Sequence, residues 1–206
     1  MKHPVKQSIA ALGLLMAVGA AGATDYTTIL TGPNESPPND SMAIGAAKVS
    51  FDMSSHTLIV NVAFAGLEGD STASHIHCCT VPAGTGTAPV ATELPSFTGF
   101  PLGVPTGAYS HTFDTSLSAT WNPSFISGNG GTTAGAEAAL LAGLNSGSAY
   151  LNVHSTTYPG GEIRGFLHPV SAVPEPASLA LLAAGLPVVA WARRRQQARK
   201  GKVDAA

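Results

Sequence analysis

The stretch "HTLIVNVAFAGL", His56 to Leu67, alternates large apolar side chains with smaller or polar ones. In an extended chain this alternation places one set of side chains on a single face: Leu58, Val60, Val62 and Phe64. The preceding run "AAKVSFDM" (46–53) alternates in the same way, with Val49 and Phe51 together. Ser54 and Ser55 separate the two runs. The pattern predicts an antiparallel hairpin whose inner face lies in an apolar core.

Similar short runs continue outward from this hairpin, and we predict strands at 26–32, 74–79, 107–114, 148–156 and 162–167. A turn at Pro159-Gly160-Gly161 joins the last two into a closing hairpin. The stretch "TAGAEAALLAGLNSG" (133–147) predicts one helix that ends at Gly143 or Gly147. Together these elements predict an all-β fold, an antiparallel β-sandwich of immunoglobulin-like or Greek-key type, with one short helix.

The two ends of the chain differ from this middle region. Lys2 and Lys6 precede the apolar run "SIAALGLLMAVGAAGA" and a small-residue site at 21–23, which is typical of a secretory signal peptide. Near the other end, the uncharged stretch 177–192 is followed by the basic run "RRRQQARK". We therefore expect a signal peptide at 1–23, a β-sandwich domain at 24–170, a linker at 171–176 and a hydrophobic helix with a basic tail at 177–206.

This C-terminal segment resembles the PEP-CTERM sorting signal, because Pro174-Glu175-Pro176 precedes the hydrophobic helix and the arginine cluster. The resemblance implies an exosortase, an integral-membrane processing enzyme, as a partner. It also implies export across the cytoplasmic membrane to the cell envelope or the extracellular space, with transient anchoring by the C-terminal helix. An ordinary single-pass anchor is the alternative. The stretch is short for a permanent span, and Pro187 lies within it.

Charge is unevenly distributed along the chain. Residues 24–170 contain only two basic residues, Lys48 and Arg164, against ten carboxylates, a net charge near −8. A surface of this sign repels a phosphate backbone, so nucleic-acid binding is excluded, whereas cations are attracted.

The middle of the chain resembles the CHRD domain. The resemblance covers Tyr26 to Leu167, and its most specific segments are His75-Ile76-His77, Asn152-Val153-His154 and the run Gly160 to Gly165. It implies an exported all-β module without a defined molecular activity. Many relatives carry glycine and a small residue after the paired histidines, where this chain has Cys78-Cys79.

The paired histidines suggest a metal site. Residues two apart on a strand point the same way, so His75 and His77 share a face, and His154 is the best third ligand. Imidazole ligands suit copper or zinc, and Cys79 is an additional candidate ligand. Cys78 and Cys79 have three alternative fates outside the cell: a vicinal disulfide, an intermolecular bridge or a metal–thiolate.

The alternative to a metal site is a polar cluster. Glu162 and Arg164 lie two residues apart on one expected strand, and a partly buried ion pair between them would orient the histidines without a metal. No nucleophile elbow, phosphate-binding loop or zinc-protease motif is present, so no catalytic residue is predicted.

The leading interpretation is a non-enzymatic cell-surface or extracellular-matrix module that is sorted by an exosortase and has a candidate transition-metal site at His75, His77 and His154. Two alternatives remain open. One is a copper-dependent redox enzyme resembling superoxide dismutase. The other is a polysaccharide-binding matrix module, for which Trp121 and Tyr158 are the candidate surface aromatics.

Overall fold

The hairpin expected from the alternating stretch lies at the centre of the sheet. In a computed structural model, which describes residues 22–170, β2 (Ile44–Asp52) and β3 (Thr57–Ala65) pair antiparallel along their whole length. Val49 lies opposite Val60, and Phe51 lies opposite Leu58. All four side chains are buried, as the alternation predicts.

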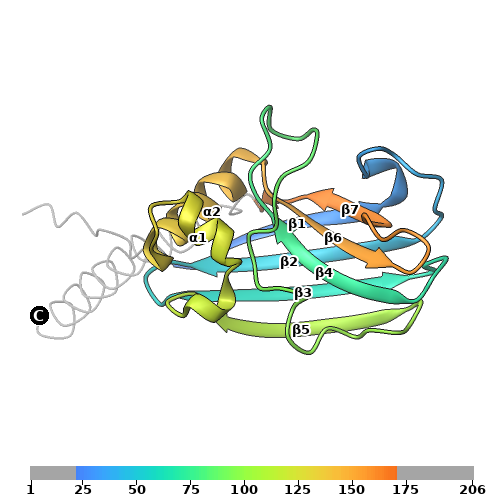
Figure 1. Cartoon of the computed structure of the whole chain (residues 1–206), viewed down its shortest axis with the longest axis horizontal. Coiled ribbons are helices and arrows are strands. Elements are labelled where there is room, and N and C mark those ends of the chain that lie inside the picture. Colours follow the sequence, from blue (N-terminus) through green and yellow to red (C-terminus); the bar gives the residue numbers. More distant parts are fainter. Residues whose placement is uncertain (1–21, 171–206) are drawn as a thin grey trace, which may run out of the picture. The chain divides into compact units, whose positions relative to one another are not determined.

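The other strands are added on both sides of this hairpin. They are β1 (Thr24–Thr31), β4 (Ser71–His77), β5 (Gly107–Asp114), β6 (Tyr150–Ser155), β7 (Ile163–Phe166) and the short β8 (His168–Pro169). The sheet order is β4-β6-β7-β1-β2-β3-β5, with β8 paired to β1, and every pairing is antiparallel. The predicted all-β antiparallel class is confirmed (Figure 1).

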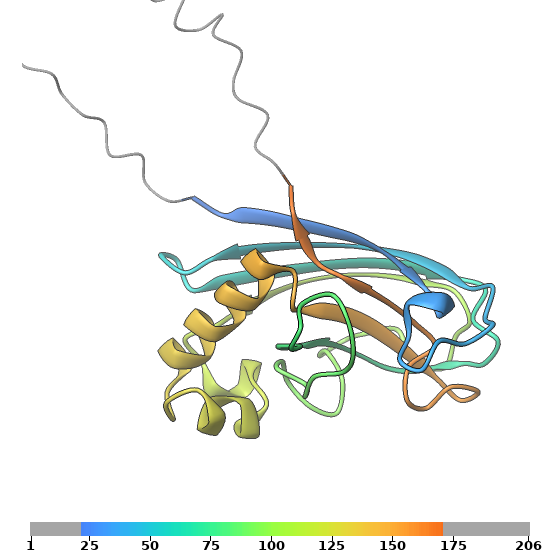
Figure 2. The same cartoon turned by 90° about the horizontal axis from the view of Figure 1, so that it is seen from above.

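One continuous sheet supplies both layers of the sandwich. Figure 2 shows the sheet curling so that β4 and β6 lie beneath β2, β3 and β5. The core fills the space between them with Leu58, Val60, Val62 and Phe64 from β3 and with Ile76, Leu151, Val153 and Ile163 from β4, β6 and β7. The opposite face of β4 and β6 therefore carries their remaining side chains, which include the histidines.

Two helices follow β5. They are α1 (Pro123–Gly128) and the longer α2 (Thr133–Ser146), and two 3₁₀ turns lie at Gly32–Asn34 and Ser118–Thr120. Thr132 caps α2 by accepting a hydrogen bond from the Gly135 N–H, and Gly147 ends it in the left-handed conformation. The predicted helix at 133–147 is thus confirmed. Leu140 and Leu144 of α2 belong to the core.

The predicted sorting segment (171–206) and the predicted signal peptide, except its last two residues, lie outside the described residues. Within 22–170, no helix is long and apolar enough to cross a membrane.

Candidate metal centre

Three histidines meet on the outer face of β4 and β6. In the antiparallel pairing of β4 and β6, His75 lies opposite Asn152. His154 lies opposite Ala73, which precedes His75 by two residues, so both histidines are on the same face of the sheet. One ring nitrogen from each of His75, His77 and His154 lies within 4.8 Å of the other two. The structure therefore brings together the three residues that the sequence suggested as metal ligands.

Backbone carbonyls hold all three rings. His75 donates from Nε2 to the Pro95 carbonyl at 2.7 Å, and His77 donates from Nδ1 to the Ala88 carbonyl at 2.8 Å. His154 donates from Nδ1 to the Pro159 carbonyl at 2.9 Å. A carbonyl oxygen only accepts, so each of these nitrogens must carry the ring proton. The other nitrogen of each neutral ring is then an unprotonated electron-pair donor.

These unprotonated nitrogens face one another. His75 Nδ1 lies 3.4 Å from His154 Nε2, and neither of these neutral groups has a proton to share. His77 Nε2 is buried and has no hydrogen-bond partner within the described part of the chain. An unsatisfied buried polar atom is costly, and three unprotonated ring nitrogens within 4.8 Å of one another match the donor set of a bound cation.

Burial keeps the rings neutral. His75 and His77 are only 5% and 9% exposed, and burial lowers the pKa of each to about 4. The neighbouring histidines contribute to this lowering of the pKa, because a second positive charge would be repelled. Burial also lowers the pKa of His154. At neutral pH the cluster therefore presents imidazole in the form that binds a metal.

These shifts predict a pH dependence for the metal-free protein. In the unfolded chain the histidines bind protons near pH 6.5, whereas His75 and His77 in the folded chain do so only near pH 4. The free energy of unfolding should therefore fall as the pH drops from about 6.5 towards 4. Urea denaturation of the metal-free protein across this range measures the loss.

Histidine NMR signals provide an internal control for this prediction. His56 donates to the buried Glu137 carboxylate at 2.8 Å, which raises the pKa of His56. At pH 5.5 we expect the His56 ring to be charged, whereas the His75 and His77 rings are neutral. If all three histidines titrate near pH 6.5, the burial of His75 and His77 and the contact of His56 with Glu137 would be contradicted.

A long connection between β4 and β5 supplies two of the three carbonyl partners. Residues 89–104 follow the outer edge of β4, with hydrogen bonds from Cys78 N–H to the Pro89 carbonyl and from Ala91 N–H to the Ile76 carbonyl. The third carbonyl comes from the turn after β6, at Pro159. Such partners fix the orientation of ligating imidazoles, but they are backbone atoms, so no sequence pattern identifies them.

The expected ion pair between Glu162 and Arg164 is not formed in the described residues. Arg164 lies 3.7 Å from Glu35, a residue of the "ESPP" loop, and both side chains are buried. Glu162 instead accepts hydrogen bonds from the Ser41 hydroxyl and the Glu68 N–H, both at 2.7 Å. The side chains diverge because Glu162 precedes β7 and does not follow the alternation of that strand.

Arg164 adjoins the histidines through an aromatic ring. Tyr150 lies on β6, between β4 and β7, and its ring stacks on His77 with a centroid separation of 4.7 Å. The Arg164 guanidinium carbon also lies 4.7 Å from the Tyr150 centroid. Arg164 donates hydrogen bonds to the Asn34 and Gly86 carbonyls as well. Tyr150 and Arg164 therefore support one wall of the candidate metal centre.

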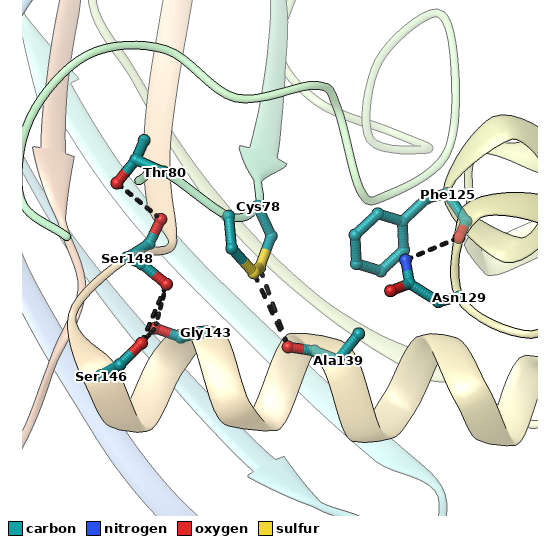
Figure 3. Close-up of a disulfide and its surroundings, with 9 residues drawn as sticks. Cys78, Thr80, Phe125, Asn129, Ala139, Gly143, Ser146 and Ser148 are labelled. Atoms are coloured by element: carbon teal, nitrogen blue, oxygen red, sulfur yellow. Dashed lines mark hydrogen bonds between the residues drawn. A yellow bond between two sulfur atoms is a disulfide. The ribbon is translucent and has the colours of Figure 1, made fainter. Parts of the chain in front are cut away.

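The cysteines lie apart from the histidines. β4 ends at His77, and Cys78 and Cys79 form a disulfide with each other. Figure 3 shows this disulfide against α2, where the sulfur atoms lie 3.8 and 3.7 Å from the Ala139 carbonyl oxygen. Cys79, the additional ligand considered from the sequence, is thus bound in a disulfide and does not join the cluster, because the strand alternation stops before it.

The contact between the disulfide and α2 depends on Gly143. A Cβ atom at this position would overlap both sulfur atoms. Gly143→Ala should therefore lower the free energy of unfolding by about 1–3 kcal/mol through overpacking, although alanine is intrinsically the better helix former. Urea denaturation tests this. Gly128→Ala is the matched control, since nothing lies near its added methyl group, and a Gly143→Ala variant more stable than the wild type would exclude the contact.

One of the two candidate carbohydrate-binding aromatics is not at the surface. Trp121 is 2% exposed and donates its indole N–H to the Thr115 carbonyl at 2.9 Å. Tyr158 is half-buried, and its hydroxyl donates to the Glu68 carboxylate at 3.1 Å. The aromatic surface expected for polysaccharide binding is thus reduced to Tyr158 alone.

The fold and the cluster define a class: an antiparallel β domain with three histidines held by backbone carbonyls on one sheet face. The chain belongs to the CHRD domain family, whose sequence model matches residues 26–167. A second model, the PEP-CTERM protein-sorting motif, matches residues 172–196. This motif marks the chain for processing by an exosortase and for a place in the cell envelope or outside the cell. Searches of curated proteins and of solved structures found no match.

Proposed function

We propose that the chain is a non-enzymatic cell-surface or extracellular-matrix protein that binds one Zn²⁺ or Cu²⁺ ion through His75, His77 and His154. One observation carries this proposal: each ring donates its N–H to a carbonyl, so three unprotonated nitrogens converge. Neutral imidazole is a preferred ligand of both metals.

The electrostatics of the domain support a cation at this point. The net charge of 24–170 is near −8, which lowers the energy of a bound cation. The guanidinium of Arg164 is the nearest opposing charge, and Glu35 lies beside it. A metal ion would also satisfy the buried Nε2 of His77, which protein groups among residues 22–170 leave unbonded.

The C-terminal segment supports a sorting role. Residues 177–192 carry no charge and precede a basic cluster, so they are suited to hold the protein in the membrane until the exosortase acts at Pro174-Glu175-Pro176. After processing, the metal-binding domain is delivered to the cell surface or the matrix.

Replacement of Pro174, Glu175 and Pro176 by alanine tests the sorting role. The expected result is accumulation of an unprocessed, membrane-associated form, measured by fractionation and intact mass. Val173→Ala, which lies beside the motif, is the control and should be processed normally. Normal processing and localisation of the triple variant would refute the sorting role and leave the metal proposal unaffected.

A further inference from the structure

Asn152 occupies the middle of the histidine cluster. It lies directly opposite His75 on β4 and directly opposite Arg164 on β7. His154 follows it by two residues on the same strand face, and the Asn152 side chain lies near that of His77. Asn152 is 2% exposed, and its Oδ1 has no hydrogen-bond partner in residues 22–170. A buried carboxamide oxygen without a donor requires an explanation.

The other end of this carboxamide lies near Glu35, whose Oε1 has no hydrogen-bond partner among residues 22–170. Asn152 Nδ2 and Glu35 Oε1 lie 3.0 and 2.6 Å from the same point, which a Cβ atom on Gly161 would occupy. Gly161 has no side chain, so the amide group and the carboxylate approach each other across it. The NH₂ group of Asn152 therefore lies on the Glu35 side of the carboxamide, and the acceptor Oδ1 is the atom on its other side.

We infer that Asn152 Oδ1 is the fourth ligand of the metal, so that His75, His77, His154 and Asn152 form a closed site of three nitrogens and one oxygen. This inference rests on the proposed metal binding and assigns a structural role to the bound metal. A site filled by four protein ligands is typical of a structural metal, whereas a catalytic zinc retains a position for water.

A closed metal site would restrict the motion of the β4–β5 connection and the β6–β7 turn. The rings already bind the carbonyls of Ala88 and Pro95 from the β4–β5 connection and of Pro159 from the β6–β7 turn. A metal that fixes the rings also fixes these backbone segments. The expected consequence is a higher melting temperature with metal and no redox or hydrolytic turnover.

The competing arrangement reverses the carboxamide, so that Asn152 donates an N–H to His77 Nε2. Oδ1 would then lie on the Glu35 side of the carboxamide. In this reversed arrangement His77 Nε2 is occupied by the Asn152 N–H, so Asn152 competes with the metal for this nitrogen. The two arrangements predict opposite effects of removing the side chain: loss of affinity if Asn152 is a ligand, and gain if it is a competitor.

The test uses the full chain, stripped of metal and titrated with Zn²⁺ and Co²⁺. Asn152→Ala should weaken Zn²⁺ binding by at least about 10-fold and alter the Co²⁺ absorption spectrum, because water replaces the oxygen ligand. Asn152→Asp retains an oxygen and should retain tight binding. The control is Asn61→Ala on β3, which should bind as the wild type does.

Solvent relaxation tests the closed site without any substitution. In the Cu²⁺-loaded wild type, water protons should relax slowly because no water is bound to the metal; Asn152→Ala should accelerate the relaxation. Unchanged affinity and spectrum in Asn152→Ala, tighter binding in that variant, or rapid relaxation in the wild type would each overturn the role of Asn152. A wild type that binds none of these metals would refute the proposed metal function itself.

Discussion

Replacement of His77 by alanine should lower the affinity for Zn²⁺ at least about 100-fold. Loss of a ligand is expected to exceed the 10- to 100-fold effect typical of groups that only orient ligands. His77 contributes a buried nitrogen that no other group in the described chain satisfies, so its removal leaves two imidazoles and a cavity beside Tyr150. Isothermal titration of the metal-free full chain measures the change.

The matched control for this prediction is His111→Ala. His111 lies on β5, opposite Val60 on β3, and is not a member of the cluster. Its replacement should leave Zn²⁺ affinity unchanged. Equal affinity of the His77→Ala variant and the wild type would show that any bound zinc lies elsewhere.

Replacement of Arg164 by alanine should destabilise the fold by about 3–5 kcal/mol, the usual effect of removing one partner of a buried ion pair. Arg164 and Glu35 are 3% and 7% exposed. Burial already raises the pKa of Glu35 to about 7, and Arg164 opposes this rise. Without the guanidinium, the pKa of Glu35 rises further, and two backbone carbonyls lose their donor. Chemical denaturation measures the loss.

The loss in the Arg164→Ala variant should depend on pH. At pH 5, Glu35 is protonated in the folded variant, so no unpaired charge is buried; at pH 8, ionisation is opposed by burial, and the destabilisation should be larger. Lys48→Ala is the control, because the exposed pair between Lys48 and Asp25 at 2.8 Å should contribute less than about 1 kcal/mol. An Arg164→Ala variant as stable as the Lys48→Ala variant would contradict this assignment.

The central hairpin and the histidine cluster could be predicted because both follow from local alternation. The period of two along 56–67 assigned Leu58 and Val60 to the core, and the same period placed His75 and His77 on one face. The third histidine of the cluster, His154, followed from the alternation in "AYLNVHS", because it lies on the strand face opposite to that of Leu151 and Val153.

Features that depend on loops or on distant contacts could not be predicted in this way. Glu35, the partner of Arg164, lies next to a 3₁₀ turn far away in the sequence, and no local pattern predicts its contact with Arg164. Cys79 was a candidate ligand only if the strand continued through it, whereas β4 ends at His77 and Cys79 is bound to Cys78 in a disulfide. Trp121 packs in the core after a short turn, where no strand alternation indicates which side chains are buried.

Zinc X-ray absorption on the loaded full chain tests the convergence of the three imidazoles most directly. After removal of excess metal by gel filtration, we expect one zinc per chain. Four nitrogen or oxygen atoms should lie about 2.0–2.1 Å from the zinc. The spectrum should also contain outer-shell scattering from three imidazole rings. Failure to retain zinc, sulfur in the first coordination sphere, or scattering from fewer than three rings would contradict the three-histidine site.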